Sequence, residues 1–205
     1  LASAIRPHLK QGAVVTDVGS VKAPVVARLE PILLPVAHFI GSHPMAGGDQ
    51  AGIRHARADL FQDAACIITP TPRSDPAAVA RISGLWSSLG CRLFQLSPEA
   101  HDRAVALVSH LPHIAAASLV RAATGADPGS LELAGPGFRD STRVAMGSAA
   151  MWDEILQANG PAVADAIRAL RSELDAVQTA LSRGQSLTAF LSDARATRLG
   201  LRRPQ

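Results

Sequence analysis

Hydrophobic positions change their spacing about halfway along the chain. In the first half, short apolar or β-branched runs end near Gly, Ser or Pro, which is typical of strands. Two helical patterns lie among them, at residues 21–33 and 74–90, and Gly90 is placed to end the second. The strand-like runs are residues 13–20, 36–44, 65–71 and 91–97. Strands that alternate with helices predict an α/β fold with a parallel sheet.

The second half carries helical spacing without a strand pattern. Residues 97–125 predict one long helix, which Ser97 caps and which Pro112 bends or opens because proline removes a backbone donor. Further helices are predicted after residues 135–137, over 151–160 and over 161–184. We therefore expect a partial Rossmann-type sheet domain at residues 1–97 and an all-helical domain at residues 98–205.

Composition and charge indicate an ordinary globular protein. Hydrophobic residues make up 47% of the 205 residues and charged residues 18%. The 20 Lys and Arg residues exceed the 17 Asp and Glu residues only slightly, with no dense basic run, so we expect no nucleic acid partner. Because no apolar run looks long enough to span a membrane and no signal peptide is visible, we expect a cytoplasmic protein without a membrane partner. Cys66 and Cys91 fit no metal or redox spacing, and we expect them reduced and buried.

Two strand ends in the first half carry candidate chemistry. GSHPMAG (41–47) places His43 where an apolar run ends, and ligands of open α/β sheets bind at such ends. The alternative is a loop histidine among turn-forming residues. DVGSVKAP (17–24) offers a glycine that permits close backbone approach, followed by Ser20. Here the alternative is that Ser20 caps a helix and Lys22 faces solvent.

Two stretches of the second half add further candidates. His110 and His113 lie three residues apart and share a helix face, unless they are a core pair beside a kink. They could ligate a metal, but no third ligand completes a known spacing, so we expect no metal site. Arg139 and Arg143 lie four apart and suit a carboxylate or phosphate, unless they are surface residues paired with Asp140 and its neighbours. Together the four stretches suit a small-molecule cleft between a sheet domain and a helical domain.

Four motifs in this order resemble the prephenate/arogenate (cyclohexadienyl) dehydrogenase family. They are DVGSVK (17–22), GSHPMAG (41–47), HDRAVALVSHLPH (101–113) and GFRDSTRVA (137–145), followed by MW (151–152). The resemblance implies a nucleotide-binding domain followed by an all-helical dimerisation domain, and therefore a homodimer. It also implies oxidative decarboxylation of prephenate or arogenate in tyrosine biosynthesis, with hydride transfer to NAD or NADP.

The resemblance implies a role for each matching residue. His43 corresponds to the base that takes the proton of the substrate hydroxyl, and Ser20 to a serine that touches that hydroxyl and the nicotinamide. The residues implied to bind the cofactor are Ser20, Gly19 and Pro44. The residues implied to bind the substrate are His113, His110, Arg143, Arg139 and Trp152.

One feature of the family is missing from the sequence. The family begins with a strand and a G-x-G-x-x-G turn that binds the pyrophosphate, and this chain contains neither. We therefore expect an N-terminally truncated chain that binds the cofactor poorly. Two alternatives remain open: another two-domain β-hydroxyacid or imine-type dehydrogenase, and a non-catalytic dimeric remnant.

Overall fold

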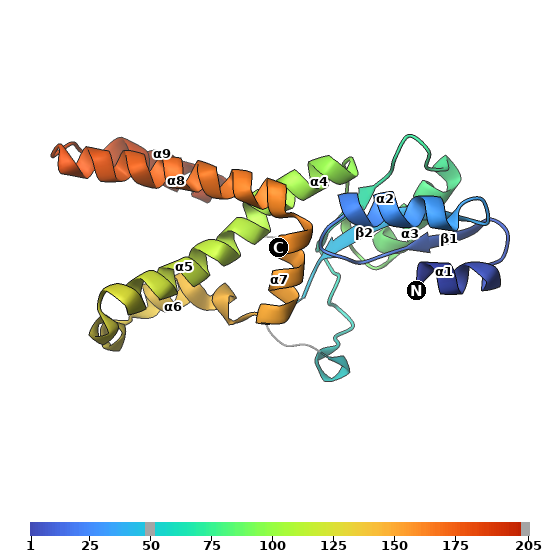
Figure 1. The fold of residues 1–205 in the computed structure, drawn as a ribbon, viewed down its shortest axis with the longest axis horizontal. Coiled ribbons are helices and arrows are strands. Elements are labelled where there is room, and N and C mark those ends of the chain that lie inside the picture. The colour runs from blue at the N-terminus through green and yellow to red at the C-terminus, as the bar shows by residue number, and fades with distance from the viewer. Residues whose placement is uncertain (48–51, 202–205) are drawn as a thin grey trace. The chain divides into compact units, whose positions relative to one another are not determined.

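The computed structural model describes residues 1–47 and 52–201 (Figure 1). The chain divides into two compact units, Leu1–Val163 and Ala164–Gln205. The first unit contains a sheet and the helices around it, and the second is helical. Because this division follows chain contacts, the predicted domain boundary at residues 97/98 stays a prediction.

A four-stranded sheet in the order β1-β2-β3-β4 organises the first unit. Its strands are β1 (Ala13–Thr16), β2 (Ala37–Met45), β3 (Ala65–Thr69) and β4 (Arg92–Gln95). The pairs β1/β2 and β3/β4 are parallel, whereas β2/β3 is antiparallel. The sheet is therefore mainly parallel, as predicted, with one antiparallel pair that was not predicted. A parallel return needs a crossover, usually a helix, and the described part of the β2–β3 connection holds only the short 3-10 helix η2 (Ile53–His55).

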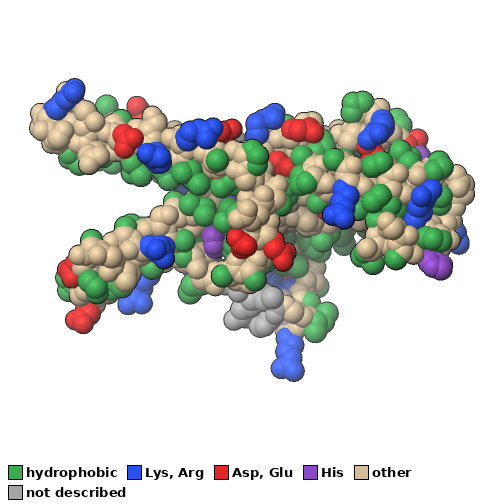
Figure 2. All heavy atoms as spheres, in the orientation of Figure 1, with side chains coloured by type: hydrophobic (Ala, Val, Ile, Leu, Met, Phe, Trp, Pro, Cys, Tyr) green, Lys and Arg blue, Asp and Glu red, His purple; other side chains and the backbone are tan. Residues whose placement is uncertain are grey.

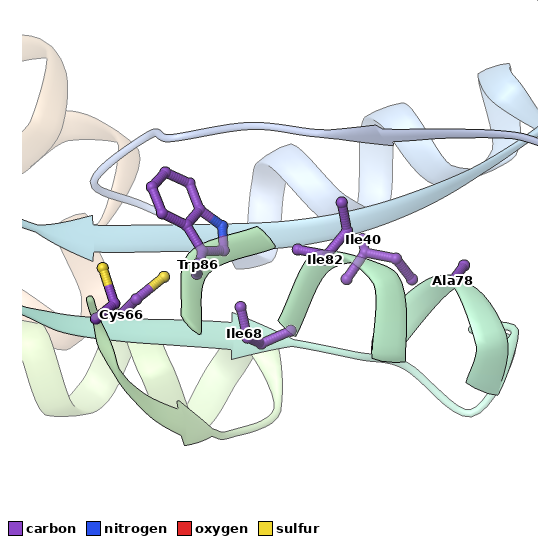
Figure 3. Close-up of a cluster of buried hydrophobic side chains, with 7 residues drawn as sticks. Ile40, Cys66, Ile68, Ala78, Ile82 and Trp86 are labelled. Atoms are coloured by element: carbon purple, nitrogen blue, oxygen red, sulfur yellow. The ribbon is translucent and has the colours of Figure 1, made fainter. Parts of the chain in front are cut away.

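Helices cover both faces of this sheet. Helix α2 (Ala23–Leu33) packs Val26 and Leu33 against Ala37 and Phe39 of β2. Helix α3 (Pro76–Ser88) covers the opposite face, as Figure 3 shows; the residues of this core are Ala78, Ile82, Trp86, Ile40, Ile68, Cys66 and Cys91. Asp75 caps α3 by accepting a hydrogen bond from the Ala78 N–H at 2.8 Å, and Gly90 follows with φ +86°. Both cysteines are buried and free, as expected.

Strand β2 is longer than either neighbour, and this length places His43. Its first half, residues 37–40, pairs with β1, and its second half, residues 41–45, pairs with β3. His43 therefore lies inside the strand, opposite Ile67, rather than in a loop after it. Pro44 is tolerated beside it because that half of the strand has one sheet neighbour, so no second ladder needs its missing N–H.

The helix after the sheet is interrupted as the sequence predicts. Ser97 caps α4 (Pro98–Val105), and its hydroxyl accepts from the Ala100 N–H at 3.1 Å. A π-helical turn, η3 (Ala106–His110), then leads into α5 (Leu111–Ala126), with Pro112 in the first turn of α5. The predicted opening at Pro112 is confirmed, because a π turn is one way to accommodate the missing backbone donor.

Among the described residues, one helical stretch, Pro98–Ala126, is long and apolar enough to cross a membrane by length and composition, with a mean hydropathy of 1.3 over an 18-residue window. The expectation that no run reaches this length is therefore wrong, because polar residues interrupt the run without making its average polar. Four of those polar side chains are buried: His101, Asp102, His110 and His113. The core helix of a folded protein passes the same test.

The remaining helices complete the chain. After η4 (Pro128–Leu133), the first unit continues with α6 (Pro136–Thr142), the 3-10 turn η5 (Arg143–Met146) and α7 (Ala149–Ala158). Helix α8 (Gly160–Ser182) begins in the first unit, and α9 (Thr188–Gly200) lies in the second. Large apolar side chains are exposed on α8 and α9, and hydrophobic side chains are frequent on the surface in Figure 2; those on α8 and α9 are Leu174, Leu181, Phe190, Leu191 and Leu199.

Also in the first unit, the N-terminal segment forms α1 (Ala2–Ile5) and the short 3-10 helix η1 (Arg6–His8). These two helices precede β1 and carry no buried residue. Ala2 and Leu9 nevertheless pack, partly buried, against the α2 side of the core.

Candidate functional site

An ion pair between a half-buried aspartate and a buried lysine closes the carboxyl end of β1. Asp17 follows the strand, and its Oδ2 accepts hydrogen bonds from the Gly19 N–H at 2.9 Å and from the Lys22 ammonium. Lys22 is fully buried and also donates to the Ser42 carbonyl at 2.9 Å. Burial lowers the pKa of Lys22, while the Asp17 carboxylate opposes that shift. The alternative of a solvated Lys22 is therefore wrong, and Lys22 rather than Ser20 is the N-cap residue of α2.

Ser42 joins this end of β1 to helix α3. Its hydroxyl donates to the Asp17 carbonyl at 2.6 Å and accepts from the Trp86 indole N–H at 3.0 Å. Thr16 lies 2.9 Å away, hydroxyl to hydroxyl. Because Ser42 immediately precedes His43, these bonds fix the backbone from which the imidazole projects.

His43 is buried and hydrogen-bonded to a histidine of α4. Its Nδ1 lies 2.8 Å from His101 Nε2, and the two rings meet edge to face with centroids 5.1 Å apart. Burial, reinforced by the neighbouring His101 and Lys22, lowers the pKa of His43 to about 3. The His43 imidazole is therefore neutral near physiological pH, as a proton acceptor must be.

Asp102 connects His101 to the start of α2. Its Oδ1 accepts from His101 Nδ1 and from the Lys22 backbone N–H, each at 2.8 Å. Its Oδ2 accepts from the Ala23 N–H at 2.8 Å. Although burial raises the pKa of Asp102, these three donors lower it more, and the net direction is down.

Asn159 links Asp102 to the second histidine of the helix. Its amide nitrogen donates to the Asp102 carbonyl at 2.8 Å and lies 3.2 Å from His110 Nδ1. An amide NH₂ carries two donors, so His110 Nδ1 accepts and its Nε2 bears the proton. Burial lowers the pKa of His110, which favours this neutral form.

His113 and Trp152 form an aromatic wall. The two rings are stacked, with centroids 3.8 Å apart and planes at 14°, and His110 meets the same indole edge to face at 6.1 Å. Gly147 makes room for them, because a Cβ there would lie 2.5 Å from the indole nitrogen. Burial lowers the pKa of His113, and its Nδ1 is buried with no hydrogen-bond partner among the described residues. A buried nitrogen without a hydrogen-bond partner costs stability.

The two arginines lie on residues 136–146, which we call the arginine segment. Arg139 is on α6 and donates from its Nε to the Ala134 carbonyl at 3.3 Å. Arg143 begins η5, where the helix changes from α to 3-10, so the pair does not share a continuous α-helical face. Both side chains are exposed, and η5 packs against α5, the helix that carries His113.

The structure therefore connects four of the nine predicted site residues in one network. Hydrogen bonds and ring contacts connect His43, through His101, Asp102 and Asn159, to His110, Trp152 and His113. Gly19 and Ser20 lie half-buried beyond β1, and Pro44 is buried in β2. Gly47 ends the first described segment, and residues 48–51 lie outside the described residues.

Five residues of this network were not predicted to act in it: Asp17, Lys22, His101, Asp102 and Asn159. His101 and Asp102 stand in the quoted run HDRAVALVSHLPH, but no sequence spacing relates them to His43, which lies 58 residues away from His101. A polar pair in the first turn of an apolar helix is the one signal that could have indicated them. Asn159 follows α7 and carried no signal.

Comparison with known proteins identifies the family. Residues 1–95 match the nucleotide-binding domain of prephenate dehydrogenase, and residues 97–191 match its dimerization domain. The chain belongs to the prephenate dehydrogenase family. The family prediction and the predicted fold class, a Rossmann-like sheet domain followed by helices, are confirmed.

Individual relatives agree with this assignment. A cyclohexadienyl dehydrogenase from Zymomonas mobilis is 33% identical, over 98% of this chain and 71% of that protein. A prephenate dehydrogenase from Bacillus subtilis is 35% identical, over 91% of this chain and 52% of that protein. Prephenate dehydrogenase from A. aeolicus, solved with hydroxyphenyl propionate and NAD+, is 32% identical, with a TM-score of 0.89 over 97% of this chain and 70% of that one. The chain thus spans between half and about three quarters of these three relatives.

Proposed function

We propose that this chain carries out the oxidative decarboxylation of prephenate or arogenate in tyrosine biosynthesis, with hydride transfer to NAD(P)⁺, in the cytoplasm. The observation that carries the proposal is His43, a buried neutral imidazole at the carboxyl end of the sheet, hydrogen-bonded through one nitrogen to His101. A second nitrogen is thereby left for a substrate. The family of the chain supplies the reaction class.

His43 takes up the proton of the substrate hydroxyl. As the C–H bond of the hydroxyl-bearing ring carbon gives up its hydride, the O–H proton passes to His43 Nε2 and a carbonyl forms. The bond from the ring to its carboxylate then breaks, CO₂ leaves, and the bonding electrons make the ring aromatic. The phenolate oxygen formed takes a proton back, so His43 ends neutral and the atoms balance.

The residues of this chain fit a nicotinamide cofactor beside His43. Gly19 and Ser20 follow β1, at the strand ends where α/β sheets bind ligands, and both are only half-buried. When bound, NAD(P)⁺ supplies the hydride acceptor. Ser20 and Gly19 would then face the nicotinamide, and the buried Pro44 would form part of the floor beside His43.

The substrate carries carboxylates, and the second half of the chain offers partners for them. Arg143 and Arg139 provide planar guanidinium donors, which suit carboxylates. His113 lies on α5, against which the arginine-bearing turn η5 packs, and Trp152 stacked on its ring would hold that ring in place beside the substrate. Apart from the substrate, the partner that we propose is a second copy of the chain, since residues 97–191 match a dimerization domain.

Turnover assays test this function directly. Prephenate and arogenate, each with NAD⁺ and with NADP⁺, should give reduced nicotinamide, CO₂ and an aromatic product in equal amounts. If NAD⁺ or NADP⁺ were reduced in the presence of a simple 3-hydroxy acid but not with prephenate or arogenate, another two-domain dehydrogenase would be favoured. A folded dimer that neither binds nor reduces either nicotinamide would favour a non-catalytic remnant.

A further inference from the structure

Three buried side chains form a line of hydrogen bonds from helix α4 to the base of the proposed reaction. His43 Nδ1 lies 2.8 Å from His101 Nε2, and His101 Nδ1 lies 2.8 Å from Asp102 Oδ1. The exposed fractions are 8% for His43, 0% for His101 and 5% for Asp102. We call these three residues the histidine relay.

Asp102 fixes the direction of this line. Its carboxylate lies at the start of α2 and accepts two backbone N–H bonds there, from Lys22 and Ala23, at 2.8 Å each. A helix N-terminus favours a negative charge, and the nearby Lys22 ammonium does the same. An ionised carboxylate can only accept, so His101 Nδ1 must carry a proton that it donates to Asp102.

The proton on His101 determines the tautomer of His43. In its neutral form His101 has one donor and one acceptor nitrogen, so its Nε2 accepts when its Nδ1 donates. The remaining hydrogen bond must then run from the His43 Nδ1–H to His101 Nε2. The lone pair of His43 is thereby on Nε2, the nitrogen that is turned away from His101.

We propose that His101 and Asp102 are positioning residues that hold His43 as its Nδ1–H tautomer, so that Nε2 is ready to accept the hydroxyl proton of the substrate. This inference rests on the proposed function of His43 as the base. The relay also stabilises the imidazolium that forms during turnover, because the proton on His43 Nδ1 stays hydrogen-bonded to a chain that ends in a carboxylate. Asp102 caps α2 as well, so it aligns the helix that follows Gly19 and Ser20.

Heteronuclear NMR of the imidazole nitrogens tests the tautomer without any substrate or cofactor. In the full chain near neutral pH, His43, assigned by the loss of its signals in His43→Asn, should carry its proton on Nδ1. Finding the proton on Nε2 in the unaltered protein would overturn the proposal, and this measurement needs no variant of His101.

Two variants of His101 extend the test to turnover. His101→Leu removes the acceptor, so His43 should shift toward the Nε2–H form, and kcat should fall about 10- to 100-fold with little change in KM. His101→Gln places an amide carbonyl that can accept from His43 Nδ1–H, and it should keep that tautomer and most of kcat. Unchanged tautomer and kcat in His101→Leu would overturn the proposal. Absence of turnover in the unaltered protein would instead count against the proposed function and leave the tautomer result standing.

Discussion

The histidine relay and the arginine segment present ionisable groups to the same proposed substrate in opposite ways. The side chains of the relay are buried and form hydrogen bonds in series, and the Asp102 carboxylate accepts three hydrogen bonds. Both arginines of the arginine segment are exposed, and Arg139 donates through its Nε to a backbone carbonyl. A buried polar group without a partner is costly, whereas an exposed guanidinium is hydrated.

This difference matches the tasks that the two regions would have. A proton acceptor must present one nitrogen in one tautomer, which requires fixed partners. An arginine that captures a carboxylate works by charge and a planar donor fork, and it can close on its ligand when the ligand arrives. We therefore expect changes in the relay to lower kcat, and changes in the arginine segment to raise KM.

The largest effect should come from His43→Asn. Asn keeps a polar side chain of similar reach but cannot accept a proton at neutral pH, so kcat should fall about 10²- to 10⁴-fold while KM changes little. Steady-state kinetics with the preferred substrate measure both constants. A large rise in KM at unchanged kcat would contradict the role of His43 as a base. The exposed His8, replaced by Asn, is the matched control for the loss of a histidine.

Arg143→Ala should act on binding instead. Losing a charge-assisted hydrogen bond to a substrate carboxylate should cost about 1.5–3 kcal/mol, which is roughly a 10- to 150-fold rise in KM, with kcat less affected. Arg121→Ala, which removes an arginine of α5 outside the arginine segment, is the control. A fall in kcat at constant KM would remove the contrast between the two regions.

Gly147→Ala should disturb the stacked rings of His113 and Trp152. The added Cβ would lie 2.5 Å from the indole nitrogen of Trp152 and 3.3 Å from His113 Cε1, so the stacked rings must shift. Overpacking of this kind costs about 1–3 kcal/mol, and urea unfolding should show the loss. At Gly137 an added Cβ would have open space around it, and Gly137→Ala should leave stability nearly unchanged.

Acidification should destabilise the protein through its buried histidines. Burial lowers the pKa of His43 to about 3 and also lowers the pKa of His110 and His113, whereas in the unfolded chain they titrate near 6.5. Between about pH 4.5 and 7 the unfolded state therefore binds more protons, and the free energy of unfolding should decrease as the pH is lowered, by up to about 1.4 kcal/mol per pH unit for each histidine.

Asp102 does not contribute to that slope. Its pKa is lowered on folding, so its stabilisation is present above the unfolded value of 3.8 and is lost only as the pH falls through the lower folded value. Urea midpoints over the same pH range should give a shallower slope for His43→Asn than for the unaltered protein. An equal slope would mean that His43 is protonated in the folded state.

The sequence predicted the local features of the fold better than the long-range ones. The Ser97 cap and the opening at Pro112 follow from residues that are neighbours in the chain, and both were predicted. The antiparallel β2/β3 pair was missed because nothing local records the direction in which a long connection returns. Helix α9 was missed as well, since its exposed apolar residues do not form a regular stripe.

The same distinction applies to the site. His43, His110, His113 and Trp152 were indicated by motif, and contacts within the fold connect them. His101, Asp102 and Asn159 were not, because their importance comes from partners that only folding brings near. A lysine after a strand looks like a solvated residue in the sequence, yet Lys22 is fully buried against Asp17.

Calorimetric titration with hydroxyphenyl propionate, in the presence of the preferred nicotinamide, tests most directly whether proton transfer by His43 and substrate binding by Arg143 are separate functions. The unaltered protein, His43→Asn and Arg143→Ala would be compared. We expect His43→Asn to bind the ligand within a few-fold of the unaltered protein, and Arg143→Ala to bind it at least about tenfold more weakly. Full affinity in Arg143→Ala together with lost affinity in His43→Asn would contradict the division of tasks between the relay and the arginine segment.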